Sequence, residues 1–189
     1  MPTADGCRQR RDRLLAALRP AEPLLLGDPL HLRYFAGFDV DPISLGADFG
    51  GLLLVRPDGH ATLFHDNKLP KSVDAAHADE RTPVPWYDGR SPGRGPRRLV
   101  LRDVIERAGG RVHDSLTDPG AAELWRTVAE LRRAKDADEV EALRECMRAT
   151  DAGHAWARAN VRPGMTELQV YAGVSAACCE AVGRPVVVY

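Results

Sequence analysis

The chain has 189 residues, a length typical of one full domain and part of another, and its composition of 44% hydrophobic and 28% charged residues can bury one sizeable core. Its formal net charge of −1 gives no overall field that would draw it to nucleic acid or an anionic membrane. The longest apolar runs, at residues 24–26 and 52–55, are far too short to span a bilayer. Composition therefore predicts a soluble protein without nucleic acid or membrane partners.

The four cysteines predict a reducing, cytoplasmic location. Cys178 and Cys179 are adjacent and cannot bridge without strain, and no two cysteines have the C-x-x-C spacing of a metal or redox site. The N-terminus carries no apolar signal-peptide run. We therefore expect reduced thiols in the cytoplasm.

The first part of the chain predicts alternating helices and strands. An arginine-rich amphipathic helix over residues 8–18 is stopped by Pro20, and residues 24–26 form a short buried strand. The aromatic segment 31–38 then enters a loop rich in Asp and Pro.

A β-hairpin follows, with strands at 52–55 and 61–64 around a Pro-Asp-Gly turn. Residues 99–108 predict a helix, and residues 111–113 a further short strand. This alternation indicates an α/β domain that covers residues 1–118.

Residues 119–189 have a different, helical character. Leu124, Val128 and Leu131 recur at helical spacing in a first helix. A capping box beginning at Asp136 opens a long amphipathic helix, and a second box beginning at Thr166 opens another. A strand begins at Val186, and we expect the sequence to stop inside it, as in a truncated protein.

The residues themselves predict no complete active site. The sequence has no phosphate-binding loop, no G-x-S-x-G nucleophile and no H-E-x-x-H zinc helix. Other candidates have simpler interpretations: exposed hairpin histidines (His60 and His65, beside Asp66), a helix histidine (His154), small core residues (Cys178 and Cys179) and a solvated arginine-rich loop at 90–102.

Several stretches, in order, resemble the peptidase family of Xaa-Pro aminopeptidase, prolidase and creatinase. Residues 32–38 are similar to the family's asparagine-isoleucine-x-tyrosine-leucine-threonine-glycine-phenylalanine stretch, and the Pro-Asp-Gly hairpin follows. Residues 131–140 resemble the start of the catalytic domain, and residues 163–167 its proline-glycine-x-threonine-glutamate turn. Departures are Ala36, where the family has threonine, His31 or Leu32 in place of asparagine, and residues 66–97, which match nothing in the family.

The resemblance implies an α/β fold: a creatinase-like N-terminal domain (a mixed sheet flanked by helices) followed by the first helices of an incomplete α+β pita-bread domain. In that domain two aspartates, a histidine and two glutamates bind two divalent metals (Mn, Co or Zn), which activate water for amide hydrolysis. The resemblance places all five ligands downstream of this chain, whose own Asp138, Glu139 and Glu167 are expected to be capping residues. The chain would therefore be inactive alone, with no catalytic or metal residues and no cofactor of its own.

The resemblance also implies a peptide substrate, a homodimer and a substrate-enclosing loop after Phe38. Asp39 or Asp41 could bind the substrate's α-amino group, because a carboxylate pairs with an ammonium; the alternative is an ordinary solvated turn. The predicted function is thus the N-terminal portion of a peptidase that cleaves the bond before proline. A non-catalytic oligomerisation or binding module, or a fragment of a creatinase-like amidinohydrolase, is the alternative.

Overall fold

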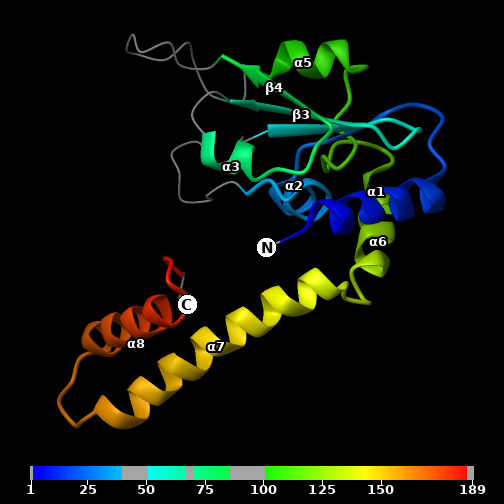
Figure 1. The fold of residues 1–189 in the computed structure, drawn as a ribbon. Coiled ribbons are helices and arrows are strands. Elements are labelled where there is room, and N and C mark those ends of the chain that lie inside the picture. The colour runs from blue at the N-terminus through cyan, green and yellow to red at the C-terminus, as the bar shows by residue number, and fades with distance from the viewer. Residues whose placement is uncertain (1, 40–50, 67–69, 86–100, 187–189) are drawn as a thin grey trace. The chain divides into compact units, whose positions relative to one another are not determined.

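A computed structural model describes residues 2–39, 51–66, 70–85 and 101–186 (Figure 1). These residues form two compact units, one over residues 2–135 and one over residues 136–189. None of the described helices is long and apolar enough to cross a membrane.

The first unit is built on a four-stranded mixed sheet in the order β1-β2-β3-β4. β1 (Leu24–Leu26) and β3 (Ala61–Asp66) both pair antiparallel with β2 (Gly51–Val55), and β3 pairs parallel with β4 (Glu80–Val84). The hairpin and the 24–26 strand are confirmed. β4 is a strand that the sequence analysis missed, because four of its five residues are exposed and it carries Pro83 at the sheet edge.

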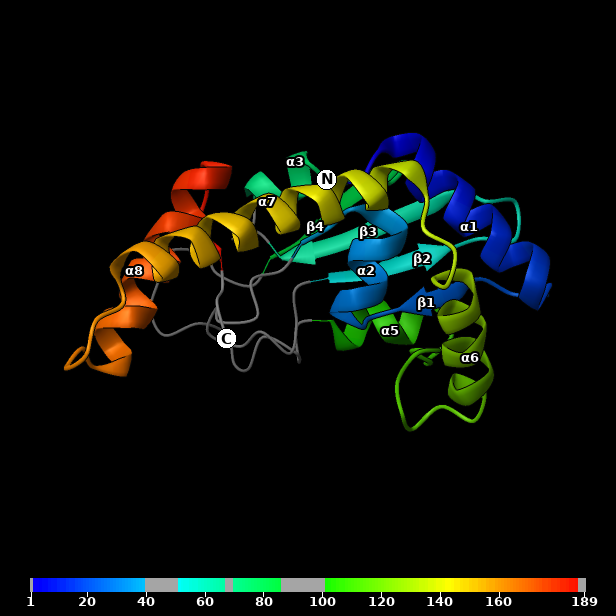
Figure 2. The same ribbon diagram turned by 90° about the horizontal axis from the view of Figure 1, so that it is seen from below.

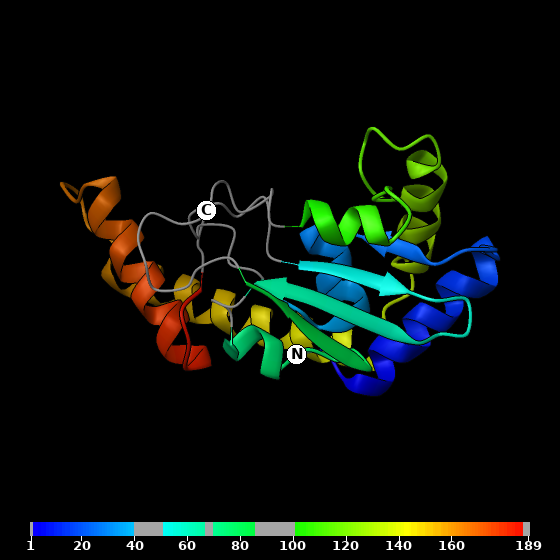
Figure 3. The same ribbon diagram turned by 90° about the horizontal axis from the view of Figure 1, so that it is seen from above.

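Helices cover both faces of this sheet (Figures 2 and 3). On one face α1 (Ala4–Leu18), α2 (Pro29–Ala36) and α6 (Ala121–Leu131) bury Leu14, Phe35 and Val128 against alternate strand residues, and the short α3 (Pro70–Asp74) adds Val73. On the other face α5 (Arg102–Arg107) packs Val104 against a second cluster. The predicted α/β class is confirmed.

The segment 111–113 is not a strand, so that prediction is wrong. The backbone N–H of His113 donates to Leu25 O (2.8 Å), but the return bond runs from Leu25 N–H to the His113 Nδ1 atom (3.0 Å). A side chain thus replaces the backbone partner that a ladder requires. The chain then turns away at Asp114.

The second unit is a helical hairpin of α7 (Ala137–Asn160) and α8 (Glu167–Val182). Both predicted capping boxes are present, from Asp136 to Glu139 and from Thr166 to Gln169, and Gly183 ends α8 in the left-handed region at φ 67°. The predicted strand from Val186 falls on residues 187–189, which lie outside the described residues. The expected domain boundary between 118 and 119 stays a prediction; α6, beyond it, packs in the first unit.

Candidate functional site

The substrate-binding candidate Asp39 lies directly after the end of α2. Its carboxylate is half exposed and lies 3.6 Å from Arg33 Nη1, also half exposed. Such surface pairs contribute little to stability, about 0–1 kcal/mol, and exchange readily with other charges. Asp41 lies outside the described residues.

Buried polar contacts fix the end of α2 from which Asp39 projects. Gly37 takes a left-handed conformation (φ 62°) that ends the helix, and Phe38 is fully buried. Arg11 Nη1 donates to Phe35 O (2.8 Å) and to His77 O (2.9 Å), and the His77 N–H donates to Ala36 O (2.6 Å). Arg11 and His77 thus supply donors to Phe35 O and Ala36 O, two carbonyls at the end of α2 that the helix itself leaves unpaired.

A buried carboxylate, that of Asp114, holds the other end of α2. It accepts hydrogen bonds from the backbone N–H groups of Gly27 (2.9 Å) and Asp28 (2.9 Å) and from the His31 Nδ1 atom (2.8 Å). Burial alone would raise the pKa of Asp114, but the His31 and backbone hydrogen bonds outweigh it and hold the pKa below its usual value. Asp114 is therefore ionised at neutral pH.

Trp125 of α6 completes this buried cluster. Its ring lies 4.2 Å from the His31 ring, centroid to centroid, and its Nε1–H donates to Asp114 O (2.9 Å). His31 is fully buried. Because solvent and substrate cannot reach the imidazole, the cluster positions α2 and α6 and has no direct chemical role.

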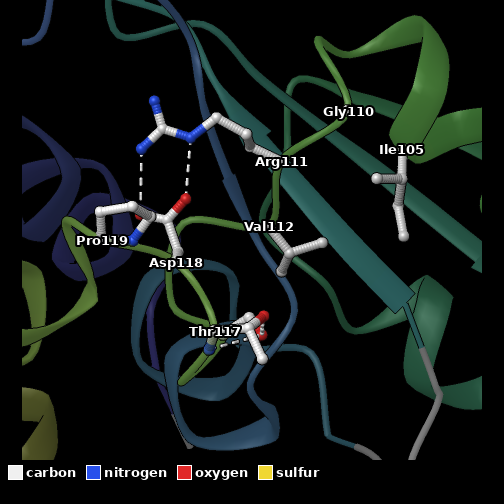
Figure 4. A pocket seen from close by; sticks show the side chains of 8 residues that line it. Ile105, Gly110, Arg111, Val112, Thr117, Asp118 and Pro119 are labelled. Carbon is white, nitrogen blue, oxygen red and sulfur yellow. Dashed lines mark hydrogen bonds and ion pairs between the residues drawn. The ribbon is translucent and has the colours of Figure 1, made fainter.

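A cavity of about 650 Å³ lies beside α5, and Figure 4 shows its lining. Arg111 and Asp118 form a two-bond ion pair across it, Nε to Oδ2 at 2.8 Å and Nη2 to Oδ1 at 3.0 Å. The hydrogen bond from Arg111 lowers the pKa of Asp118 to about 2. The hydroxyls of Ser115 and Thr117 bond each other (2.9 Å). These polar groups satisfy one another, so the cavity presents no activated nucleophile or base.

Among the described residues, one cluster of three potential metal ligands comes together: the carboxylates of Asp136, Asp138 and Glu139, within 4.8 Å of one another. Glu139 Oε2 accepts the Asp136 N–H (3.1 Å), and the Asp136 side chain accepts the N–H of Glu139 in return. Carboxylates occupied in a helix cap, without an imidazole, do not fit the two-metal ligand set that the resemblance implies. No catalytic step is derived from them.

The other sequence candidates have structural positions. His60 is partly exposed and lies 3.9 Å from Glu80, but His65 is buried, so its expected exposure is wrong. The reason is that β3 continues through Asp66 and pairs His65 with Gly51 inside the sheet. Cys178 is buried, as expected of a small core residue, and His154 is exposed on α7.

Sequence reasoning missed three of the residues that build this site: Arg11, His31 and Asp114. Arg11 belongs to the predicted arginine-rich helix, where an arginine is expected to be exposed, yet it is buried. Its burial could have been predicted from its spacing, because Arg11 lies three residues before Leu14 and therefore on the same helix face. No local pattern connects His31 with Asp114, 83 residues apart.

No protein-family model matches the sequence, and no curated protein matches it significantly. Solved structures do match. The Xaa-Pro dipeptidase from Bacillus anthracis is 18% identical with a TM-score of 0.61, covering 92% of this chain and 49% of that one. The dipeptidase PepE from Mycobacterium ulcerans is 24% identical with a TM-score of 0.59, covering 94% and 50%.

The prolidase from Pyrococcus furiosus matches at 15% identity with a TM-score of 0.55, covering 89% of this chain and 48% of that one. This chain thus spans about half the length of the solved structures that it matches. Its sheet and flanking helices correspond to the N-terminal domain of these enzymes. The chain therefore has the fold of the N-terminal portion of the Xaa-Pro dipeptidases and prolidases.

Proposed function

We propose that this chain is the N-terminal portion of an Xaa-Pro dipeptidase-type metallopeptidase, which hydrolyses the bond before proline in short peptides. One observation carries the proposal. About nine-tenths of this chain aligns with dipeptidase and prolidase structures, and the aligned part is about half of each of those structures. The two divalent metals of such an enzyme, Mn, Co or Zn, would activate its water and be held outside the described residues. A cytoplasmic location, consistent with four free cysteines, is part of the proposal.

In this proposal the α/β unit binds substrate rather than cleaving it. Asp114 fixes the start of α2 and Arg11 fixes its end. Asp39 therefore follows a helix that is held in place at both ends. The carboxylate of Asp39 or Asp41 would pair with the α-amino group of a peptide. The alternative is a solvated turn in which Asp39 binds only Arg33.

The substrate-binding assignment predicts a kinetic effect in a full-length parent enzyme. Asp39→Asn or Asp41→Asn should raise KM for Xaa-Pro dipeptides about tenfold, because a charge-assisted hydrogen bond contributes about 1.5–3 kcal/mol. Folding should be unchanged, since Asp39 is half exposed. The exposed Asp74→Asn is the matched control and should leave KM unchanged. If both loop variants keep wild-type kinetics, the segment is only a turn.

The 189-residue chain alone should have no peptidase activity. Bulk water has a pKa near 15.7 and needs a bound metal to attack an amide at neutral pH. The resemblance places the ligands for that metal outside this chain. The test is to incubate the purified chain with Mn²⁺, Co²⁺ or Zn²⁺ and an Xaa-Pro dipeptide, with the Bacillus anthracis dipeptidase as positive control, and to measure released proline. Metal-dependent turnover that survives repurification would show that this chain has a catalytic centre.

A further inference from the structure

Another cavity, of about 520 Å³, lies where the start of α1 meets the segment 77–81 that leads into β4. We call it the α1 cavity. Its volume is within the range of small-molecule sites. Three arginines and two aspartates line it, so its charged side chains sum to a positive charge: Arg8, Arg11, Arg81, Asp5 and Asp79. The lining therefore favours a negatively charged ligand.

The guanidinium of Arg11 brings hydrogen-bond donors to this cavity that the protein leaves unused. Its side chain is only 2% exposed. Nη1 donates to Phe35 O and to His77 O, but the Nε–H has no hydrogen-bond partner among the described residues. Nη2 lies 3.7 Å from Asp79 Oδ2, which is too far for a hydrogen bond. Because buried polar groups are ordinarily hydrogen-bonded, this guanidinium can bind a further acceptor.

The positive charge of Arg11 is also incompletely balanced. Burial lowers the pKa of Arg11 from its usual value, and the Asp79 carboxylate offsets this only in part. That carboxylate is shared, because its Oδ1 accepts from Arg8 Nη2 (2.8 Å) and its Oδ2 accepts from the Ala61 N–H (2.8 Å). One carboxylate thus serves two guanidiniums, and a further anion beside Arg11 would be stabilised.

The start of α1 adds backbone donors to the same cavity. Thr3 Oγ1 accepts the N–H of Gly6 (3.1 Å), whereas the N–H groups of Ala4 and Asp5 have no acceptor within the helix. Ala4 and Asp5 both line the cavity. The partial positive charge of a helix N-terminus favours an anion, and the exposed Asp5 side chain can remain in solvent.

We propose that the α1 cavity binds a phosphate group, held by the guanidiniums of Arg8, Arg11 and Arg81 and by the start of α1. Arg8 and Arg81 can contribute, because a guanidinium has five N–H donors and their Nη2 atoms supply the bonds to Asp79 Oδ1 and Ala76 O. Phosphate suits this arrangement better than a carboxylate does, since its additional oxygens can accept from several directions at once. The inference rests on the residues of the cavity and not on the proposed peptidase function.

Calorimetric titration of the 189-residue chain with inorganic phosphate, at an ionic strength held constant with sodium chloride, tests this proposal. The wild type should bind phosphate saturably at one site. Arg8→Gln and Arg81→Gln should each weaken binding about tenfold, the change expected when one charge-assisted hydrogen bond is lost. Arg126→Gln removes the same charge from an exposed position of α6 outside the cavity, so it is the matched control and should bind as the wild type does.

Asp79→Asn should have the opposite effect and tighten phosphate binding. The asparagine keeps an oxygen for the Ala61 N–H but removes the negative charge that competes with phosphate for Arg8 and Arg11. An arginine cluster with a purely structural role would lose stability in this variant and gain no affinity. Circular dichroism of each variant separates loss of folding from loss of binding.

A wild-type chain without saturable binding would overturn the proposal. So would Arg8→Gln and Arg81→Gln variants that bind phosphate as tightly as Arg126→Gln, or an Asp79→Asn variant that binds it no more tightly than the wild type. A parallel titration with glycerol phosphate identifies the source of the phosphate group. Tighter binding of glycerol phosphate than of inorganic phosphate indicates a phosphorylated small molecule, and equal or weaker binding indicates free phosphate.

Discussion

Asp114→Asn should destabilise the α/β unit by about 1–3 kcal/mol, the cost of leaving a buried hydrogen-bond donor without its acceptor. The carboxylate accepts hydrogen bonds from Gly27, Asp28 and His31, and its side chain is almost fully buried. An asparagine amide offers one acceptor oxygen, and its NH₂ group would face donors. Hydrogen exchange of the β1–β3 amides measures the effect within this unit.

The same carboxylate predicts how stability depends on pH. The pKa of Asp114 is lower in the folded than in the unfolded chain, where it is about 4. Its contribution is therefore fully present above pH 4 and is lost as pH falls through the folded-state value. Asp114→Asn should reduce the loss of folding stability at acid pH. Substitution of an exposed carboxylate, Asp103→Asn, should leave that loss nearly unchanged. An Asp114→Asn variant with wild-type stability and acid response would show that the buried cluster does not support α2.

Gly173→Ala should destabilise the α7–α8 hairpin by about 1–3 kcal/mol, the usual cost of overpacking. A Cβ atom at Gly173 would overlap the indole ring of Trp156, so the ring would have to leave its place between the helices. Faster hydrogen exchange throughout α8 should follow, while the α/β unit keeps its protection.

The control for this prediction is Ala176→Leu, which adds a larger side chain at an exposed position of α8. It should leave exchange in α8 close to wild type, since leucine is a good helix former and meets solvent there. Unchanged protection in Gly173→Ala would mean that the close contact between α7 and α8 does not hold the hairpin together.

Elements set by local patterns could be predicted from the sequence. The two capping boxes need only residues three positions apart, and the hairpin needs only its turn and two β-rich runs. Helix α2 is not among the predicted elements, although Asp28 followed by Pro29 is a typical helix N-terminus.

Features set by distant contacts could not be predicted. β4 is recognised as a strand only through its pairing with β3, because it has no apolar alternation of its own. The candidate site depends on His31 meeting Asp114 and Arg11 meeting the end of α2, at separations of 83 and 24 residues. Such partners are brought together by the packing of the sheet and helices, which local spacing does not encode.

The most direct test of the central claim is proline release by the protein encoded when the reading frame is followed past the codon for Tyr189. The account predicts an open frame that supplies two aspartates, a histidine and two glutamates, and a product that releases proline from an Xaa-Pro dipeptide when Mn²⁺, Co²⁺ or Zn²⁺ is present. A stop codon directly after Tyr189 would contradict it and favour a non-catalytic module. A longer product that hydrolyses creatine and no peptide would contradict it in favour of an amidinohydrolase.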